Sequence, residues 1–158
     1  MENQQKLTHE YFMRLAVDEA RAGIRSGHGG PFGAVIVRDG KVIAAGHNMV
    51  VAQNDPTCHG EVNAIRKACQ ELKTFDLSGC DIYTTGEPCP MCLGACLWAN
   101  IGHIYYGGTS QDIDAIGFRD DFFYHQMENK ENLVEQVGRE DCLELFREYQ
   151  EIQEKIAY

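Results

Sequence analysis

The chain has no long apolar run, no low-complexity stretch and no internal repeat. A helix that crosses a bilayer needs about 20 consecutive apolar residues, so the sequence excludes such a helix. The first ten residues, MENQQKLTHE, also have no apolar core of the kind found in signal peptides. We therefore expect a cytoplasmic protein with no membrane partner, folded as a single domain over residues 1–158.

Basic residues are scarce. The 14 Lys and Arg stand against 24 Asp and Glu, which gives a formal net charge of −10. A protein that grips a polynucleotide needs a basic surface to replace counterions, and this chain has no basic run. The charge balance argues against a nucleic-acid partner and favours a small-molecule substrate.

Seven cysteines are an odd number for a chain without an export signal, and a disulfide framework is not expected in a reducing compartment. Two of them, Cys89 and Cys92, have the spacing of metal ligands. The other five are interpreted as small buried hydrophobic residues: Cys58, Cys69, Cys80, Cys96 and Cys142.

Apolar periodicity and turn signals predict an alternation of helices and strands. Helices are expected at about 9–25 (N-capped by Thr8), 59–73, 90–99 and from a capping box at Asp141 and Glu144 almost to Tyr158. Strands are expected at 33–37, 41–46, 81–85, 103–107 and 133–137, the first two joined by an Asp39-Gly40 hairpin turn. Residues 108–130, with one short helical segment near 111–116, form a long connection of the kind that often acts as a lid. This order predicts a three-layer α/β/α sandwich with a five-stranded mixed sheet.

Two short motifs carry metal-binding chemistry. Residues 59–61 read His-Gly-Glu, and residues 88–92 read Pro-Cys-Pro-Met-Cys. Cys89 and Cys92 are three residues apart at the start of a predicted helix, so they share a face where the helix dipole favours thiolates. With His59 they make three zinc ligands, which is the number found in catalytic sites that leave the fourth position to water.

A closed structural zinc site is the alternative. Its fourth ligand would have to be Cys96, but this residue lies about 10 Å along the helix from Cys89. Tetrahedral zinc needs sulfurs roughly 4 Å apart, so Cys96 does not reach the same ion. Glu61 would have no task in a closed site. Beside a catalytic zinc, its carboxylate can shuttle protons instead of serving as an ordinary helix-start acid.

These motifs together give H-x-E followed by P-C-x-x-C, and the chain resembles the cytidine deaminase superfamily. The likeness runs through GGPFGAVIV, GHN, NDPT and GEPCPMCLGA, of which NDPT and PCPMC are shared with relatives that act on other bases. The GF-DDF stretch at 117–122 and the terminal Tyr158 make the chain most similar to bacterial guanine deaminases. The resemblance implies one zinc per subunit and hydrolytic deamination of guanine to xanthine and ammonia. Deamination of adenosine in tRNA, or of cytosine or another amino-substituted ring, stays open. A zinc-stapled binding module without catalysis is the alternative outside the enzymes.

The resemblance also implies roles for individual residues. Asn48 would bond the ring edge of the base, or else its own backbone. Phe32 would pack on the base, or else be core. Asp120 would be a second catalytic residue, lying over the amino-bearing edge and helping protons leave, or else be a solvated loop acid. Trp98 would line the pocket, or else be a buried helix residue.

The C-terminal segment, residues 141–158, would be exchanged between the subunits of a homodimer, and Tyr158 would complete the partner's site. Two positions depart from the expected pattern. Gly60 stands where Ala is usual, although its backbone N–H can still serve a substrate carbonyl. Arg119 stands where an acidic residue is expected, which bears on the choice of base.

Overall fold

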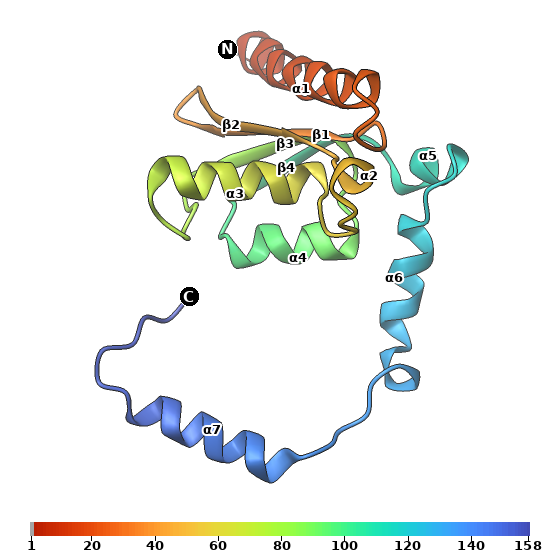
Figure 1. The fold of residues 1–158 in the computed structure, drawn as a ribbon. Coiled ribbons are helices and arrows are strands. Elements are labelled where there is room, and N and C mark those ends of the chain that lie inside the picture. Colours follow the sequence, from red (N-terminus) through yellow and green to blue (C-terminus); the bar gives the residue numbers. More distant parts are fainter. Residues whose placement is uncertain (1) are drawn as a thin grey trace.

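The computed structural model describes residues 2–158, and their side chains from Thr8 onward (Figure 1). Its helices are α1 (Glu2–Arg25), α2 (Val50–Gln53), α3 (Gly60–Leu72), α4 (Pro90–Trp98), α5 (Ser110–Ala115), α6 (Asp120–Glu128) and α7 (Arg139–Glu151), with a 3-10 turn η1 (Lys130–Asn132). Its strands are β1 (Gly33–Arg38), β2 (Lys41–His47), β3 (Asp81–Gly86) and β4 (His103–Gly108). None of the described helices combines the length and apolarity needed to cross a membrane.

The four described strands form one mixed sheet in the order β2-β1-β3-β4. β1 pairs antiparallel with both β2 and β3, whereas β3 and β4 run parallel and are connected through α4. Asp39 and Gly40 both have positive φ, of 50° and 74°, which is the backbone geometry of a tight two-residue hairpin turn. The predicted Asp39-Gly40 hairpin is thus confirmed.

Helices cover both faces of the sheet. α1 lies on one face, and α3 and α4 lie on the other (Figure 1). Because neighbouring side chains of a strand point to opposite faces, Val35 packs with Phe12 and Ala16 of α1, while Ile36 packs in the core beneath α3 and α4. The predicted three-layer α/β/α arrangement is confirmed for this mixed sheet.

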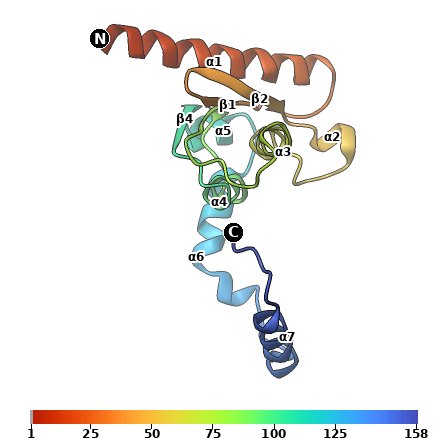
Figure 2. The ribbon, with the colours of Figure 1, turned by 90° about the vertical axis from the view of Figure 1, so that its left-hand side faces the viewer.

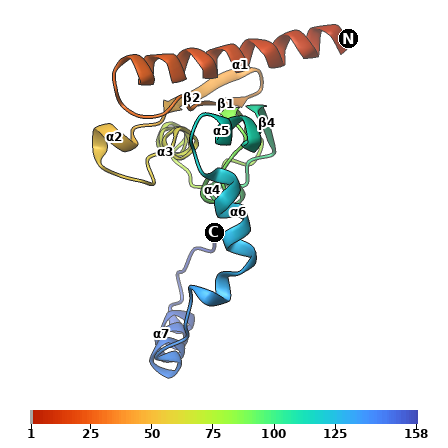
Figure 3. The same cartoon turned by 90° about the vertical axis from the view of Figure 1, so that its right-hand side faces the viewer.

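The chain from Asn129 onward departs from the layered body. In all three ribbon views α7 lies apart from the sheet, and the C-terminus returns toward α4 (Figures 1, 2 and 3). Its apolar side chains are exposed in the single chain: Leu133, Val134, Val137, Leu145, Phe146, Tyr149, Ile152, Ile156 and Tyr158. This segment, residues 129–158, is called the C-terminal arm below.

Several predicted element boundaries are wrong. Residues 134–138 are irregular, so within residues 2–158 the sheet has four strands and the predicted fifth is missing from the single chain. A strand needs a neighbour for its backbone groups, and among residues 2–158 these residues pair with no strand. α7 begins after Gly138, which adopts a left-handed conformation at the N-cap, so the predicted capping box at Asp141 does not start the helix.

Two further differences concern helix length, and a third is an additional helix. α1 begins at Glu2, ahead of the expected cap at Thr8. The intervening residues are good helix formers, so the helix continues through them. α7 ends at Glu151, well before Tyr158. The predicted long connection contains a second helix, α6, as well as the expected short one.

Candidate active site

Three side chains converge where α3 and α4 begin. His59 is the N-cap of α3, Cys89 is the N-cap of α4 with Pro90 following it, and Cys92 lies in the first turn of α4. The Nδ1 atom of His59 lies 3.6 Å from the Sγ atom of Cys89 and 3.5 Å from that of Cys92. All three ligand atoms lie within 4.8 Å of one another.

These distances match a zinc site. Zn–N bonds of about 2.0 Å and Zn–S bonds of about 2.3 Å at a tetrahedral angle put nitrogen and sulfur about 3.5 Å apart. Two thiolates and one neutral imidazole are also the donor set that zinc favours, and they balance its charge. The residues present therefore fit zinc.

The electrostatics of the cluster favour proton sharing. The Cys92 thiol donates to the Cys89 sulfur, which lowers the pKa of Cys89 to about 4 and raises the pKa of Cys92. The pKa of His59 is raised, chiefly by its hydrogen bond with Cys89. A cation that takes these ligands must displace their protons, so its binding is pH-dependent.

Glu61 lies in the first turn of α3, buried beside the cluster. Its Oε2 atom lies 3.4 Å from the Cys92 sulfur, and its Oε1 atom accepts a hydrogen bond from the Thr84 hydroxyl at 3.2 Å. Burial raises the pKa of Glu61. A carboxyl group held in this way keeps a proton more readily than an exposed one, which suits a group that takes and returns protons.

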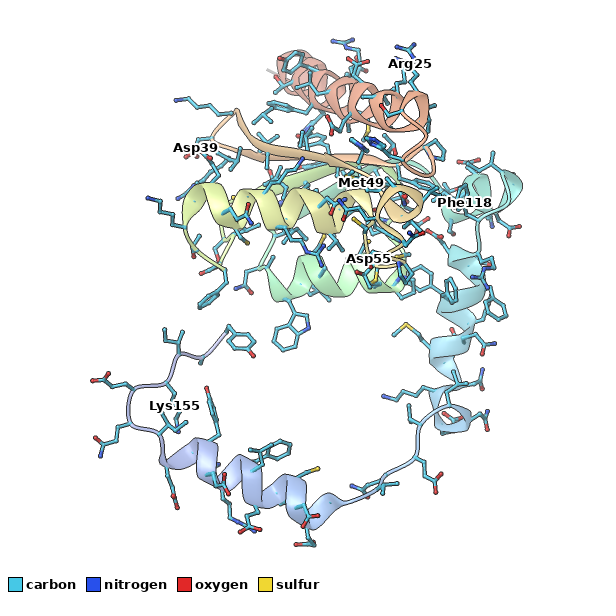
Figure 4. The ribbon with its side chains drawn as sticks, viewed as in Figure 1. Arg25, Asp39, Met49, Asp55, Phe118 and Lys155 are labelled. Atoms are coloured by element: carbon cyan, nitrogen blue, oxygen red, sulfur yellow. The ribbon has the colours of Figure 1, made fainter. Side chains whose placement is uncertain are left out.

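A pocket of about 360 Å³ opens in front of these residues, at the low end of the range for small-molecule sites. Its lining includes His59, Glu61 and Cys89 together with Asn48, Phe32 and Asp120. Figure 4 shows that Met49, Asp55 and Phe118 gather at this end of the molecule, whereas Asp39 of the hairpin lies at the opposite end. Two residues predicted to contact the substrate, Asn48 and Phe32, thus lie in one pocket with the metal cluster and with Asp120, which was predicted to be catalytic.

Asn48 directly follows β2 and is buried. Its Oδ1 atom accepts a hydrogen bond from the Val50 backbone N–H at 3.1 Å, and its own backbone N–H donates to the Phe32 carbonyl. The alternative prediction for this side chain, a hydrogen bond to the nearby backbone, is therefore met. This hydrogen bond uses one of the two lone pairs of the oxygen and does not use the N–H groups of the amide, which remain donors.

Asp120 begins α6, where the helix dipole favours a carboxylate. Burial, followed by the charge of Cys89, nevertheless raises the pKa of Asp120. α6 is tied to the metal cluster by the Tyr124 hydroxyl, which donates to the Pro88 carbonyl at 2.6 Å. Pro88 precedes Cys89, so this hydrogen bond sets the position of Asp120 relative to the zinc ligands.

Three other predicted contacts lie elsewhere in the single chain. Gly60 does not line the pocket, and a Cβ atom at this position would lie 3.0 Å from the Phe32 carbonyl oxygen. Trp98, 70% exposed, ends α4 and lies outside the pocket, with its ring centroid 6.0 Å from that of Tyr158. Neither Trp98 nor Tyr158 lines the pocket of its own chain. For Tyr158, the role in a partner's pocket stays a prediction.

Three residues of the site were not predicted from the sequence. Thr84 is buried in β3 and bonds Glu61, and the period-two pattern of that strand could have placed it beside α3. Glu87 lines the pocket and accepts from the Ser110 backbone N–H at the start of α5. Phe118 meets Phe32 edge to face, with centroids 4.9 Å apart. No local pattern indicates that this aromatic pair would form.

Residues 6–108 match the family model described as the cytidine and deoxycytidylate deaminase zinc-binding region. The chain belongs to this family. Its members are zinc-dependent hydrolases, and the His59, Cys89 and Cys92 cluster falls inside the matched region.

Within the family, the similarity to guanine deaminases is extensive. The chain is 49% identical to the guanine deaminase of Bacillus subtilis (strain 168) over 122 residues, which are 77% of this chain and 78% of the relative. The solved structure of guanine deaminase from Bacillus subtilis superposes with a TM-score of 0.90 at 44% identity, covering 95% of this chain and 98% of that one. The tRNA-specific adenosine deaminase of Agrobacterium fabrum is 40% identical over 144 residues, covering 87% of this chain and 93% of the relative.

Proposed function

We propose that this protein hydrolyses guanine to xanthine and ammonia. The observation that carries the proposal is the placement of Glu61, a buried carboxyl with a raised pKa that faces the same pocket as the zinc-binding cluster. The higher identity to a guanine deaminase than to a tRNA deaminase supports guanine as the base. The net charge of −10 supports a small substrate over tRNA.

One zinc ion per chain would be held by His59, Cys89 and Cys92. Bound there, zinc supplies a Lewis acid that activates water. Glu61 accepts the proton that water loses as it attacks the amine-bearing ring carbon, and delivers it to a ring nitrogen. Glu61 then carries the second proton to the departing amine, so that guanine and water become xanthine and ammonia.

The pocket walls would supply base recognition. Because the Asn48 oxygen is held by the Val50 N–H, the amide N–H groups of Asn48 would face the base. They suit the carbonyl oxygen of guanine and not the amino group that adenine carries in the same place. Phe32 offers an aromatic surface to the ring. Asp120 lies on the same lining as Glu61 and would accept a hydrogen bond from the amino group.

We also propose a homodimer in which the C-terminal arm is exchanged between subunits. Support comes from the apolar side chains of α7 and the residues around it, which have no cover in the single chain. The outer edge of β4 is unpaired among residues 2–158, and residues 133–137 of a partner would add the predicted fifth strand there. Such an exchange would bring the partner's Tyr158 toward this pocket. It would also bury the exposed Trp98 side chain in the interface between the subunits.

Ammonia release from zinc-loaded protein tests the activity. Guanine, adenine, cytosine, guanosine and a tRNA anticodon stem-loop are compared side by side, with Glu61→Gln protein as the control for contaminating enzymes. We expect release from guanine alone. Release from the stem-loop alone would assign the protein to the tRNA deaminases. No ammonia release from any of the five compounds, with zinc bound, would favour a binding module or another ring substrate.

A further inference from the structure

Two histidines and a glutamate from three different elements form a hydrogen-bonded row beside the pocket. The Nδ1 atom of His47, the last residue of β2, lies 2.8 Å from the Oε1 atom of Glu19 on α1. The Nε2 atom of His47 lies 2.7 Å from the Nδ1 atom of His28, in the loop after α1. The two imidazole rings also stack, with centroids 5.0 Å apart.

This row is built into the fold. The side chains of His47 and Glu19 are only 16% and 26% exposed. Gly23 of α1 leaves room for the His47 ring, because a Cβ atom at that position would lie 2.6 Å from it. A substitution at Gly23 would therefore displace His47 from its two partners.

The row ends on the pocket wall. The His28 carbonyl accepts the backbone N–H groups of both Val51 and Ala52 at 3.0 Å, and so fixes the first turn of α2. Gly29, the next residue, packs so closely on Asn48 that a Cβ atom would lie 2.1 Å from its Oδ1 atom. Gly29, Asn48 and Val51 all line the pocket, so a movement of His28 moves the surface that faces the base.

Only some protonation states of His47 and His28 are compatible with these hydrogen bonds. The short contact between His47 and His28 needs one hydrogen between two nitrogens. His47 donates its Nδ1–H to the Glu19 carboxylate, and the remaining contact holds with either a neutral pair or a single shared extra proton. When both rings are imidazolium, the two facing nitrogens both carry hydrogens and the contact is lost.

We propose that Glu19, His47 and His28 are positioning residues that hold the Asn48 wall of the pocket, and that a second proton on the histidine pair releases this wall. The proposal rests on the proposed function, because it assigns the wall to binding of the base. It predicts weaker substrate binding at acidic pH, separate from any change in the chemical step at Glu61.

The other described charged side chains on α1 and α3 bond elsewhere or are exposed. On α1, Arg21 pairs with Asp18, 3.2 Å away, and Arg25 is exposed at the end of the helix (Figure 4). On α3, Lys67 donates to the Ala45 carbonyl, and the neutral Asn63 donates to the His47 carbonyl. Among the described residues, Glu19 is therefore the charged group bonded to the pair.

The test measures KM and kcat for guanine from about pH 5 to 8, the range in which imidazoles titrate. In the variant His28→Asn, a carboxamide that cannot be protonated takes the place of Nδ1. The matched control is His103→Asn, the same substitution on the exposed start of β4. We expect the KM of the wild type to rise toward acid about fivefold more than the KM of His28→Asn, the value of one net hydrogen bond, and His103→Asn to behave as the wild type.

Hydrogen exchange provides a second measurement that does not depend on activity. Hydrogen-exchange protection of the Val51 and Ala52 amides, corrected for intrinsic exchange, should fall toward acid in the wild type and stay constant in His28→Asn. Parallel pH profiles of the two proteins would overturn the proposal, as would constant wild-type protection across the range. If the wild type releases no ammonia from any base, the proposed function fails while the exchange measurement still decides this inference.

Discussion

The hydroxyl of Thr84 lies 3.2 Å from the Oε1 atom of Glu61 and 3.0 Å from the Gly86 carbonyl oxygen. One hydroxyl has a single hydrogen. When Glu61 is ionised the hydroxyl donates to the carboxylate, and when Glu61 is protonated the hydroxyl can donate to Gly86 and accept from Glu61. Thr84 thus serves Glu61 in both of its protonation states.

Thr84→Val keeps the shape of the side chain and removes this partner. We expect kcat to fall about tenfold, the value of a hydrogen bond to a charged group at the low end of its range, with zinc content unchanged. Thr84→Ser, which keeps the hydroxyl, is the matched control and should retain most activity. Steady-state kinetics and metal analysis on the three proteins decide it, and an unimpaired Thr84→Val would show that Glu61 needs no such partner.

Glu61→Gln should separate catalysis from stability. Turnover should fall by about 10²–10⁴-fold, the usual contribution of a general acid–base group, while zinc remains bound. Burial raises the pKa of Glu61 above its ordinary value of 4.5. Below that value both the folded and unfolded states are protonated. As pH rises further the unfolded state ionises first, so the wild type loses folding stability until the pH passes the folded pKa.

The stability gain of Glu61→Gln should therefore be absent near pH 4 and largest near pH 8. Thermal unfolding in the presence of a chelator measures it, because a bound cation would offset the cost of the carboxylate. Glu71→Gln, an exposed acid on the same helix, is the control. An equal gain at both pH values would mean that the buried carboxyl is not the cause.

Removal of zinc should abolish activity and leave the fold. The two cores, one under α1 around Phe12 and Val35 and the other under α3 and α4 around Ile36 and Leu77, are formed by apolar side chains that do not depend on a metal. Circular dichroism after chelation should keep its helical signal while ammonia release stops, and added zinc should restore turnover. Unfolding on chelation is the behaviour of a zinc-stapled module.

The layers and the metal cluster were predictable from the sequence because both rest on local patterns. Asp39 and Gly40 mark a hairpin turn, and the spacing of Cys89 and Cys92 at a helix start brings both sulfurs to one face. The pairing of Phe32 with Phe118 was not predictable, because it depends on how α5 and α6 pack and so place the residues between them. Residues 133–137 have the composition of a strand. Composition alone does not tell whether such a segment pairs with a strand of its own chain or of another.

Complementation between two inactive variants tests the exchanged arm. Deletion of Tyr158 leaves Glu61 intact, and Glu61→Gln leaves the arm intact. If the arm completes the partner's site, unfolding and refolding the two together should give heterodimers with one whole site each. Random pairing then restores about a quarter of wild-type activity per chain. An arm that acts on its own chain gives no restoration, because no chain then has both parts, and mixing without refolding serves as the control for slow exchange.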